Sequence, residues 1–472
     1  MEVNNDSGPD AIFVAACALV LGLFNKVALR WTRLPNTVLQ LGWGLLLGIG
    51  NETWAGGLHY LGPGITAWQN INPARLSALF LPPLLFAGAV SLPGRVLLKA
   101  SSHIALLGIG GVLTGSGMTA VVAKFVLPYD WTWLQSLLFG AIVAATDPVA
   151  AVALLKEVRA PEDVRVTVDG EALLDDGVAA VLYTVFLSVV EGERQTAGGV
   201  IKLLFRQSLG GPAVGIAFAI ATLLGAMLLG PDACLQSTLL LAGAYGCFVV
   251  AEDVLHTSGI LAVVAMGMSI SLLRLLTAVD RVKLDPAVWL VWEFVEFVAN
   301  SLAFVMIGIL VASKVYQGHH SLGILTGADY GWAVLLWLLL LVIRVINLLA
   351  FWPIMVRTGY GTTFATTVIT AWSGIRGLVG LVLALSVLDA SSIGDKRFQV
   401  SSFYFMATTL VLTTVVQGSS YSLLLKVAGQ SKAFAVESPA HVTAMPATVL
   451  SGTRELSLQP GGSVMPAPVL AR

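Results

Sequence analysis

Residues 169–177 read DGEALLDDG and place four carboxylates inside an otherwise apolar stretch. The apolar stretch before it carries a fifth, in the sequence Thr146-Asp147-Pro148. A charged side chain near the centre of a bilayer costs at least ~2.5 kcal/mol, so acids at such positions are rare and typically line an ion pathway. Acids in two consecutive apolar segments therefore indicate a function in ion binding or ion movement.

The composition is that of a membrane protein. Charged residues make up 11% of the 472 residues and hydrophobic residues 57%, whereas roughly 25% of a typical soluble chain is charged. The net charge of −1, without a basic run, excludes nucleic acid as a partner. The three cysteines, Cys17, Cys234 and Cys247, are too few and too widely spaced for a disulfide framework or a zinc site, and no cofactor is expected.

Thirteen apolar runs, most of them near the ~20 residues that cross a hydrocarbon core, predict an all-α polytopic membrane protein with about 13 transmembrane helices. The runs lie at 11–30, 35–50, 75–92, 100–127, 133–155, 165–190, 201–229, 236–254, 258–276, 288–312, 331–354, 362–388 and 399–425. Residues 1–10 form a short N-terminal segment before this transmembrane domain (11–426). Residues 427–472 are polar and rich in Ser, Thr, Pro and Ala, which predicts a disordered cytoplasmic tail.

The basic residues favour an orientation with the N-terminus outside and the C-terminus in the cytoplasm. In that orientation thirteen Lys and Arg residues lie on the inner side and eight on the outer side. The chain start lacks the basic region of a signal peptide, so the first apolar run is expected to be a retained span.

The odd number of spans suggests two inverted six-helix repeats joined by the span at 201–229. Transporters built in this way bind their substrate where helices are interrupted at corresponding positions of the two halves. The fifth span of the first half contains Thr146-Asp147-Pro148, where the proline removes a helical hydrogen bond. The fifth span of the second half contains WSGIRG at 372–377. The two interruptions correspond in position.

Helical spacing separates the acids of the first motif into two faces. Asp176 lies on one face, and Glu171 and Asp175 share the neighbouring face about 100° away. If Asp176 meets the break at Thr146 and Asp147, two carboxylates, a hydroxyl and free carbonyl groups converge. Hard oxygen ligands of this kind suit a small cation such as Na⁺. The same carboxylates bind H⁺, and competition for one site is sufficient for antiport.

Three further residues complete the predicted site. Asp175 is expected to titrate together with Asp176 as a coupled pair. Arg376, in the second interruption, needs a buried partner, and Glu171 is the candidate because a guanidinium group holds a carboxylate in a bidentate fork.

Two other classes of protein remain open at this point. An intramembrane aspartyl protease also buries two aspartates, but its GxGD motif is represented only by Ser392-Ile393-Gly394-Asp395, which lacks the first glycine. A membrane sensor that binds a cation without moving it is the second alternative.

Three motifs resemble, in order and spacing, the signatures of the sodium/proton exchangers of the monovalent cation/proton antiporter group. They are ATDPVA at 145–150, GEALLDDG at 170–177 and SGIRG at 373–377. The resemblance implies a thirteen-span inverted-repeat fold with crossed broken helices, usually a homodimer. By position, Asp176 resembles the essential ion-binding aspartate, Thr146 and Asp147 resemble its neighbours in the broken helix, and Glu171 with Arg376 resembles the structural ion pair.

The chain departs from the family pattern at two positions. Ala172 replaces a common Ser, and Asp175 replaces the Asn of electroneutral members. An Asp-Asp pair resembles the electrogenic branch, but that branch places a lysine where this chain has Arg376, and arginine does not release its proton. We therefore expect a secondary transporter, not an enzyme, that exchanges Na⁺ for H⁺ one for one by alternating access, with Li⁺ or K⁺ as alternative cations. We expect the protein to lie in the plasma membrane and to contribute to pH and sodium homeostasis.

Overall fold

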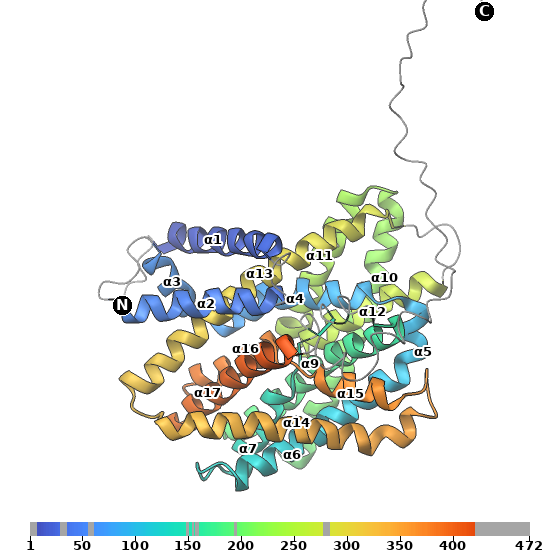
Figure 1. Cartoon of the computed structure of the whole chain (residues 1–472). Helices are drawn as coiled ribbons and strands as arrows, with labels where there is room; N and C mark the ends of the chain where they lie inside the picture. Colours follow the sequence, from blue (N-terminus) through green and yellow to red (C-terminus); the bar gives the residue numbers. More distant parts are fainter. Residues whose placement is uncertain are drawn as a thin grey trace, which may run out of the picture.

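The regular structure of the protein is helical. The computed structural model describes residues 7–28, 35–54, 61–147, 151–152, 155, 160–192, 196–276 and 284–420. Every regular element in these ranges is a helix (Figure 1), and nine of the helical segments there are long and apolar enough to cross a membrane. The predicted all-α polytopic membrane fold is confirmed. The number of thirteen crossings and the inverted repeats stay predictions, and the predicted tail at 427–472 lies outside the described ranges.

The helices follow the predicted apolar runs. Their bounds are α1 Ser7–Ala28, α2 Asn36–Thr53, α3 Gly62–Gln69, α4 Pro73–Ser91, α5 Gly94–Ala105, α6 Val112–Phe125, α7 Trp133–Ala144, α9 Glu162–Val190, α10 Ala197–Leu229, α11 Ala233–Val249, α12 Gly259–Leu276, α13 Ala287–Tyr316, α14 Gly327–Met355, α15 Phe364–Trp372, α16 Leu378–Asp389 and α17 Lys396–Leu412. A π-helical turn joins α5 to α6 (Leu106–Gly111), and others extend α11 (Val250–Val254), α13 (Gln317–Ser321) and α17 (Thr413–Gln417). The short helix α3 was not expected, because its eight residues cannot cross a bilayer.

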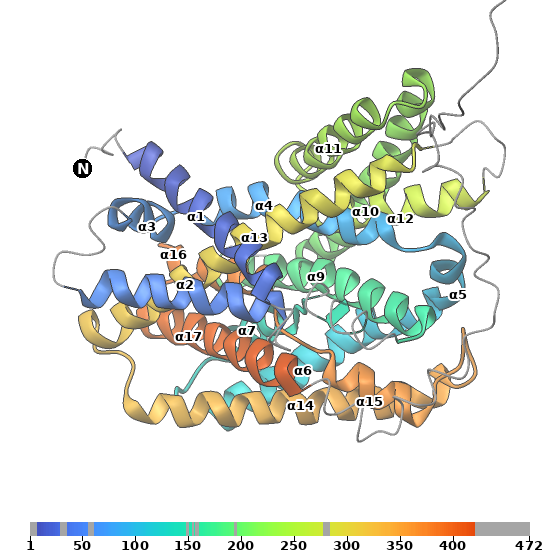
Figure 2. The same cartoon turned by 45° about the horizontal axis from the view of Figure 1, so that its top comes forward.

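The helix with the acidic motif runs through the middle of the bundle. Helix α9 lies among α4, α5, α7, α12 and α16, and both views show it enclosed by other helices (Figure 1 and Figure 2). Within α9, Asp175 and Asp176 are buried. The acids therefore face protein on every side rather than lipid.

Small residues allow the helices to approach closely. Where α2 crosses α13, a Cβ atom on Gly44 would overlap the carbonyl oxygen of Val305, and one on Gly308 would lie 2.6 Å from the backbone nitrogen of Leu45. Lipid supplies no hydrophobic driving force between helices, so van der Waals contact between backbones is a main source of their association. Glycine at 44 and 308 is thus required by the crossing of these two helices.

Gly44→Ala is expected to lower the thermal stability of the purified protein, because the added methyl group forces α2 and α13 apart. Overpacking of this kind typically costs about 1–3 kcal/mol. Gly42→Ala is the matched control, since a Cβ at Gly42 meets no atom within 4 Å and alanine favours the helix. Thermal unfolding in detergent checks both variants, and equal melting temperatures for them would contradict the close crossing.

Candidate functional site

The two interrupted helices meet at one backbone hydrogen bond. Helix α7 ends at Ala144, and α15 and α16 are separated by residues 373–377. The backbone N–H of Asp147 donates to the carbonyl oxygen of Ile375 over 2.6 Å. A Cβ atom on Gly377 would lie 2.7 Å from the Cβ of Asp147, so only glycine permits this approach. Pro148, the predicted cause of the first break, lies outside the described residues.

Arg376 holds the end of α7. Its Nη1 donates to the carbonyl oxygen of Ala144 over 3.0 Å, and its backbone N–H donates to Oγ1 of Thr413 over 3.1 Å. The last carbonyls of a helix lack partners within the helix and form the negative end of its dipole. The guanidinium group therefore compensates the C-terminus of α7 inside the membrane domain.

The ion pair of Glu171 differs from the prediction. Arg344 of α14 contacts Glu171 with 2.6 Å between Nη1 and Oε1, and the glutamate is buried. The predicted partner, Arg376, is wrong, because its guanidinium group is held by the α7 carbonyls instead. The sequence does carry a signal for Arg344, since it is the sole charged residue between Gly331 and Met355 of a long apolar helix.

The structure brings the other predicted site residues together. Oγ1 of Thr146 donates to Oδ2 of Asp175 over 3.1 Å. Asp176 is 3% exposed and lies close enough to Asp147 and Asp175 for their charges to interact. In the part of the chain that the structure describes, the Oδ1 atoms of Asp175 and Asp176 accept no hydrogen bond. Their role as ion ligands stays a prediction.

The two adjacent aspartates have different electrostatic surroundings. Asp175 lies near the guanidinium groups of Arg344 and Arg376 and also near the carboxylate of Glu171. The charges that act on Asp176 are those of other carboxylates, Asp147 and Asp175. A buried carboxylate among like charges is stable only when a proton or a cation neutralises it. Asp175 therefore has arginines among its charged neighbours, whereas the charges that act on Asp176 are those of carboxylates.

A small cavity of about 30 Å³ adjoins Asp175, Arg344 and Arg376. A water molecule needs roughly 10–15 Å³ of such space and two to four polar partners. These charged groups, together with Asn347 in the same wall, meet that requirement. The buried charges can therefore be hydrated locally.

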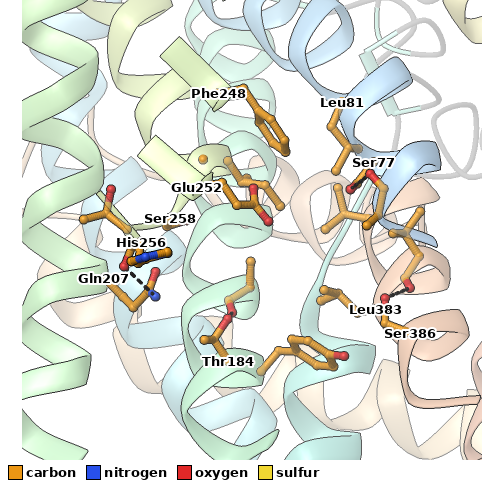
Figure 3. A pocket seen from close by; sticks show the side chains of 18 residues that line it. Ser77, Leu81, Thr184, Gln207, Phe248, Glu252, His256, Ser258, Leu383 and Ser386 are labelled. Atoms are coloured by element: carbon orange, nitrogen blue, oxygen red, sulfur yellow. Dashed lines mark hydrogen bonds between the residues drawn. The ribbon is translucent and has the colours of Figure 1, made fainter. Parts of the chain in front are cut away.

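A larger cavity of about 360 Å³ lies beside α9 (Figure 3). Its wall includes Ala180 and Thr184 of α9, four and eight residues after Asp176 and thus on the same helix face. Glu252, in the π-helical turn after α11, projects into the cavity, and Ser77 lies opposite (Figure 3). The cavity offers polar groups along the side of α9 that carries Asp176.

The aspartyl protease alternative has no support in the structure. Asp395, the acid of the incomplete GxGD motif, is exposed, and its Oδ1 caps the N-terminus of α17 by accepting the N–H of Phe398. Helix capping is an ordinary role for an aspartate at this position. Across the described ranges, no three His, Cys, Asp or Glu side chains converge closely enough to hold a resident metal ion.

A polytopic helical protein with buried carboxylates at the crossing of two interrupted helices has the architecture of a secondary transporter. Comparison with known families specifies the class further. The model of the family "Sodium/hydrogen exchanger, transmembrane" matches residues 15–427, so the chain belongs to that family. The resemblance inferred from the three motifs is thereby confirmed.

Individual relatives agree with this assignment. The chain is 35% identical over 427 residues to Sodium/hydrogen exchanger 8 of Arabidopsis thaliana, covering 90% of this chain but only 56% of that relative. It is 28% identical to the Na⁺/H⁺ antiporter NhaP of Pseudomonas aeruginosa, covering 88% and 96% of the two chains. The fold is similar to that of the sodium proton antiporter MjNhaP1 from Methanocaldococcus jannaschii, with a TM-score of 0.70 at 20% identity, covering 91% and 99%.

Neutralising either Glu171 or Arg344 is expected to destabilise the protein strongly, because the remaining charge is left buried. Breaking a buried pair in this way typically costs about 3–5 kcal/mol. In a double-mutant cycle with Glu171→Gln and Arg344→Met, we expect a coupling energy of roughly 0.5–3 kcal/mol. Unfolding of the purified variants measures it.

The cycle of Glu171→Gln with Arg376→Met serves as the control. Those two changes should be nearly additive, because Arg376 is bonded to the end of α7 and not to Glu171. A large coupling in the control cycle and none with Arg344 would restore the pairing predicted from sequence.

Proposed function

We propose that the protein exchanges Na⁺ for H⁺ across a membrane by alternating access. The observation that carries this proposal is Asp176, a buried acid beside Asp147 and Asp175 at the crossing of two interrupted helices. A carboxylate in this setting is neutralised by either a proton or a metal ion. When the site opens to one side at a time, the two ions are carried in opposite directions.

Oxygen atoms near Asp176 suit an alkali cation. We propose Asp176, Asp147 and Thr146 as its ligands, with the backbone carbonyls of the interruption completing the shell. Such hard oxygen ligands favour Na⁺, with Li⁺ and K⁺ as alternatives. Two carboxylates and a hydroxyl hold a monovalent cation loosely enough for it to leave on the opposite side.

The cavity beside α9 supports a route for the ions. Its walls carry hydroxyl and carboxylate groups, among them Thr184 and Glu252. A polar, water-sized passage is what a hydrated cation requires, since stripping its water in an apolar passage is costly. We propose that Na⁺ and H⁺ reach Asp176 through this cavity.

The surroundings of Asp175 support a role in setting the cation affinity and pH dependence of the site rather than in carrying ions. Its carboxylate accepts the Thr146 hydroxyl and lies near two arginines, which offset part of the cost of burying its charge. Arginine keeps its proton at every cellular pH. With Asp176 alone loaded in turn by Na⁺ or H⁺, one-for-one exchange follows.

Three finer points complete the proposal. The distribution of Lys and Arg supports an N-terminus outside and a cytoplasmic C-terminus. The family resemblance supports a homodimer. The plasma membrane is the proposed location, where exchange would contribute to sodium and pH homeostasis.

Asp176→Asn is expected to abolish exchange, because the amide binds neither ion in this role. Asp175→Asn should retain exchange with an altered cation affinity or pH dependence. Dissipation of a pH gradient in proteoliposomes, with Na⁺, K⁺ and Li⁺ added in turn, measures exchange by the wild type and by both variants. Asp389→Asn, an exposed carboxylate at the end of α16, is the control and should match the wild type.

Near-normal flux in the Asp176→Asn variant would show that Asp176 is not a ligand of the transported ions. A wild-type protein that binds Na⁺ but dissipates no gradient with any of the three cations would instead identify a sensor.

One-for-one exchange predicts that transport does not respond to voltage. In proteoliposomes with no gradient of pH or Na⁺, an imposed membrane potential should drive no net movement of protons. An internal pH dye reports the result. A clear response that depends on the sign of the potential would show that Asp175 also carries a proton.

A further inference from the structure

A second cavity, which we call the lateral groove, lies between α2, α13, α14 and α17. Its volume is about 520 Å³, within the roughly 300–1,000 Å³ typical of ligand sites. Most of its wall is apolar: Leu45, Ile49, Val311, Val315, Val411 and Leu412. The groove shares no residue with the acidic site or with the cavity beside α9.

The lateral groove adjoins the lipid-facing side of α14. Val334, in its wall, is 45% exposed, and Leu338 continues the same exposed apolar face one turn further. Large apolar side chains exposed on a membrane-spanning helix contact lipid tails. The groove is therefore in reach of the acyl chains of the surrounding bilayer.

One end of the groove is polar and lies near a membrane surface. Tyr316 is the last residue of α13, and its ring packs 4.4 Å from that of His320, which in turn lies 4.8 Å from His319. Tyr330, in the first turn of α14, packs against Tyr404 with 5.9 Å between ring centres. Rings with a polar tip are typical of the boundary between hydrocarbon and headgroups.

Two buried polar atoms at this end have no hydrogen-bond partner. Tyr404 is 1% exposed, and its hydroxyl makes no hydrogen bond within the described residues. The Nδ1 atom of His319 is also buried and makes no hydrogen bond within those residues. An unsatisfied buried hydroxyl costs about 1–3 kcal/mol. A ligand with oxygen atoms at this end of the groove would remove that cost.

We propose that the lateral groove binds one membrane phospholipid. An acyl chain lies along the apolar wall, an ester oxygen accepts the Tyr404 hydroxyl, and the phosphate lies at His319 and His320. Gly318, in the same turn as the histidines, lies beside Val400 of α17. Tyr404 is four residues further along α17, about 6 Å at 1.5 Å per residue, and so lies deeper than the histidines. This order from phosphate to ester to acyl chain is that of a phospholipid. The proposal follows from the membrane embedding and is independent of ion exchange.

Native mass spectrometry of the detergent-purified protein tests the proposal, with palmitoyl-oleoyl phosphatidylcholine as the probe. The wild type is expected to retain one lipid at low lipid concentration. Ala333→Phe places a ring in the groove from the wall of α14 and should lower retention at least fivefold. Tyr404→Phe keeps the ring and removes only the hydroxyl, so it should lower retention by a smaller factor without affecting folding.

Two matched variants control for general effects. Leu338→Phe adds a ring on the exposed face of α14 outside the groove, and Tyr360→Phe removes a hydroxyl from a tyrosine elsewhere on the surface. Both should retain lipid as the wild type does. Wild-type retention in both groove variants, or equal losses in the groove and control variants, would overturn the proposal. If Ala333→Phe fails to fold, the lipid retention of Tyr404→Phe compared with that of Tyr360→Phe decides whether the proposal holds.

Discussion

The site depends on one backbone contact between two chain segments that are not helical. The N–H of Asp147 and the carbonyl of Ile375 bond across the interruptions of their helices. Backbone groups freed inside a membrane must find partners within the protein, because lipid offers none. The two breaks satisfy each other, and Arg376 neutralises the end of α7 that the first break exposes. The acids of α9 are then placed against an already compensated crossing.

The charges around this crossing separate into those with a partner of opposite charge or dipole and those beside other carboxylates. Glu171 with Arg344, and Arg376 with the α7 carbonyls, are paired within the protein and need no ion from outside. Asp176 has carboxylate neighbours instead. A buried acid of this kind is favoured when a proton or a cation neutralises it. Glu171, paired with an arginine, and Asp176, set among other carboxylates, are thus distinguished by their neighbours although they lie on adjacent turns of α9.

Sequence alone predicted the all-helical fold and the membership in the exchanger family, because apolar length and acidic motifs in lipid have few explanations. It also predicted that Thr146, Asp147, Asp175 and Asp176 would converge. It failed for the partner of Glu171, because Arg344 and Arg376 both lie in other spans and sequence does not show which of them reaches the glutamate. Pairing across helices depends on tertiary geometry, and helical periodicity describes only one helix. The unpredicted α3 is too short to leave a hydropathy signal.

The π-helical turn Val250–Val254 has a consequence for how the cavity beside α9 could change in evolution. Such a turn holds one residue more than an α-helical turn, so a one-residue deletion within it would leave an α-helical turn. Because each residue of an α-helix advances the side chains by about 100°, deleting one residue here would rotate Glu252 out of the cavity wall. The charge of the cavity can thus be switched by a change in chain length, with every side chain type retained.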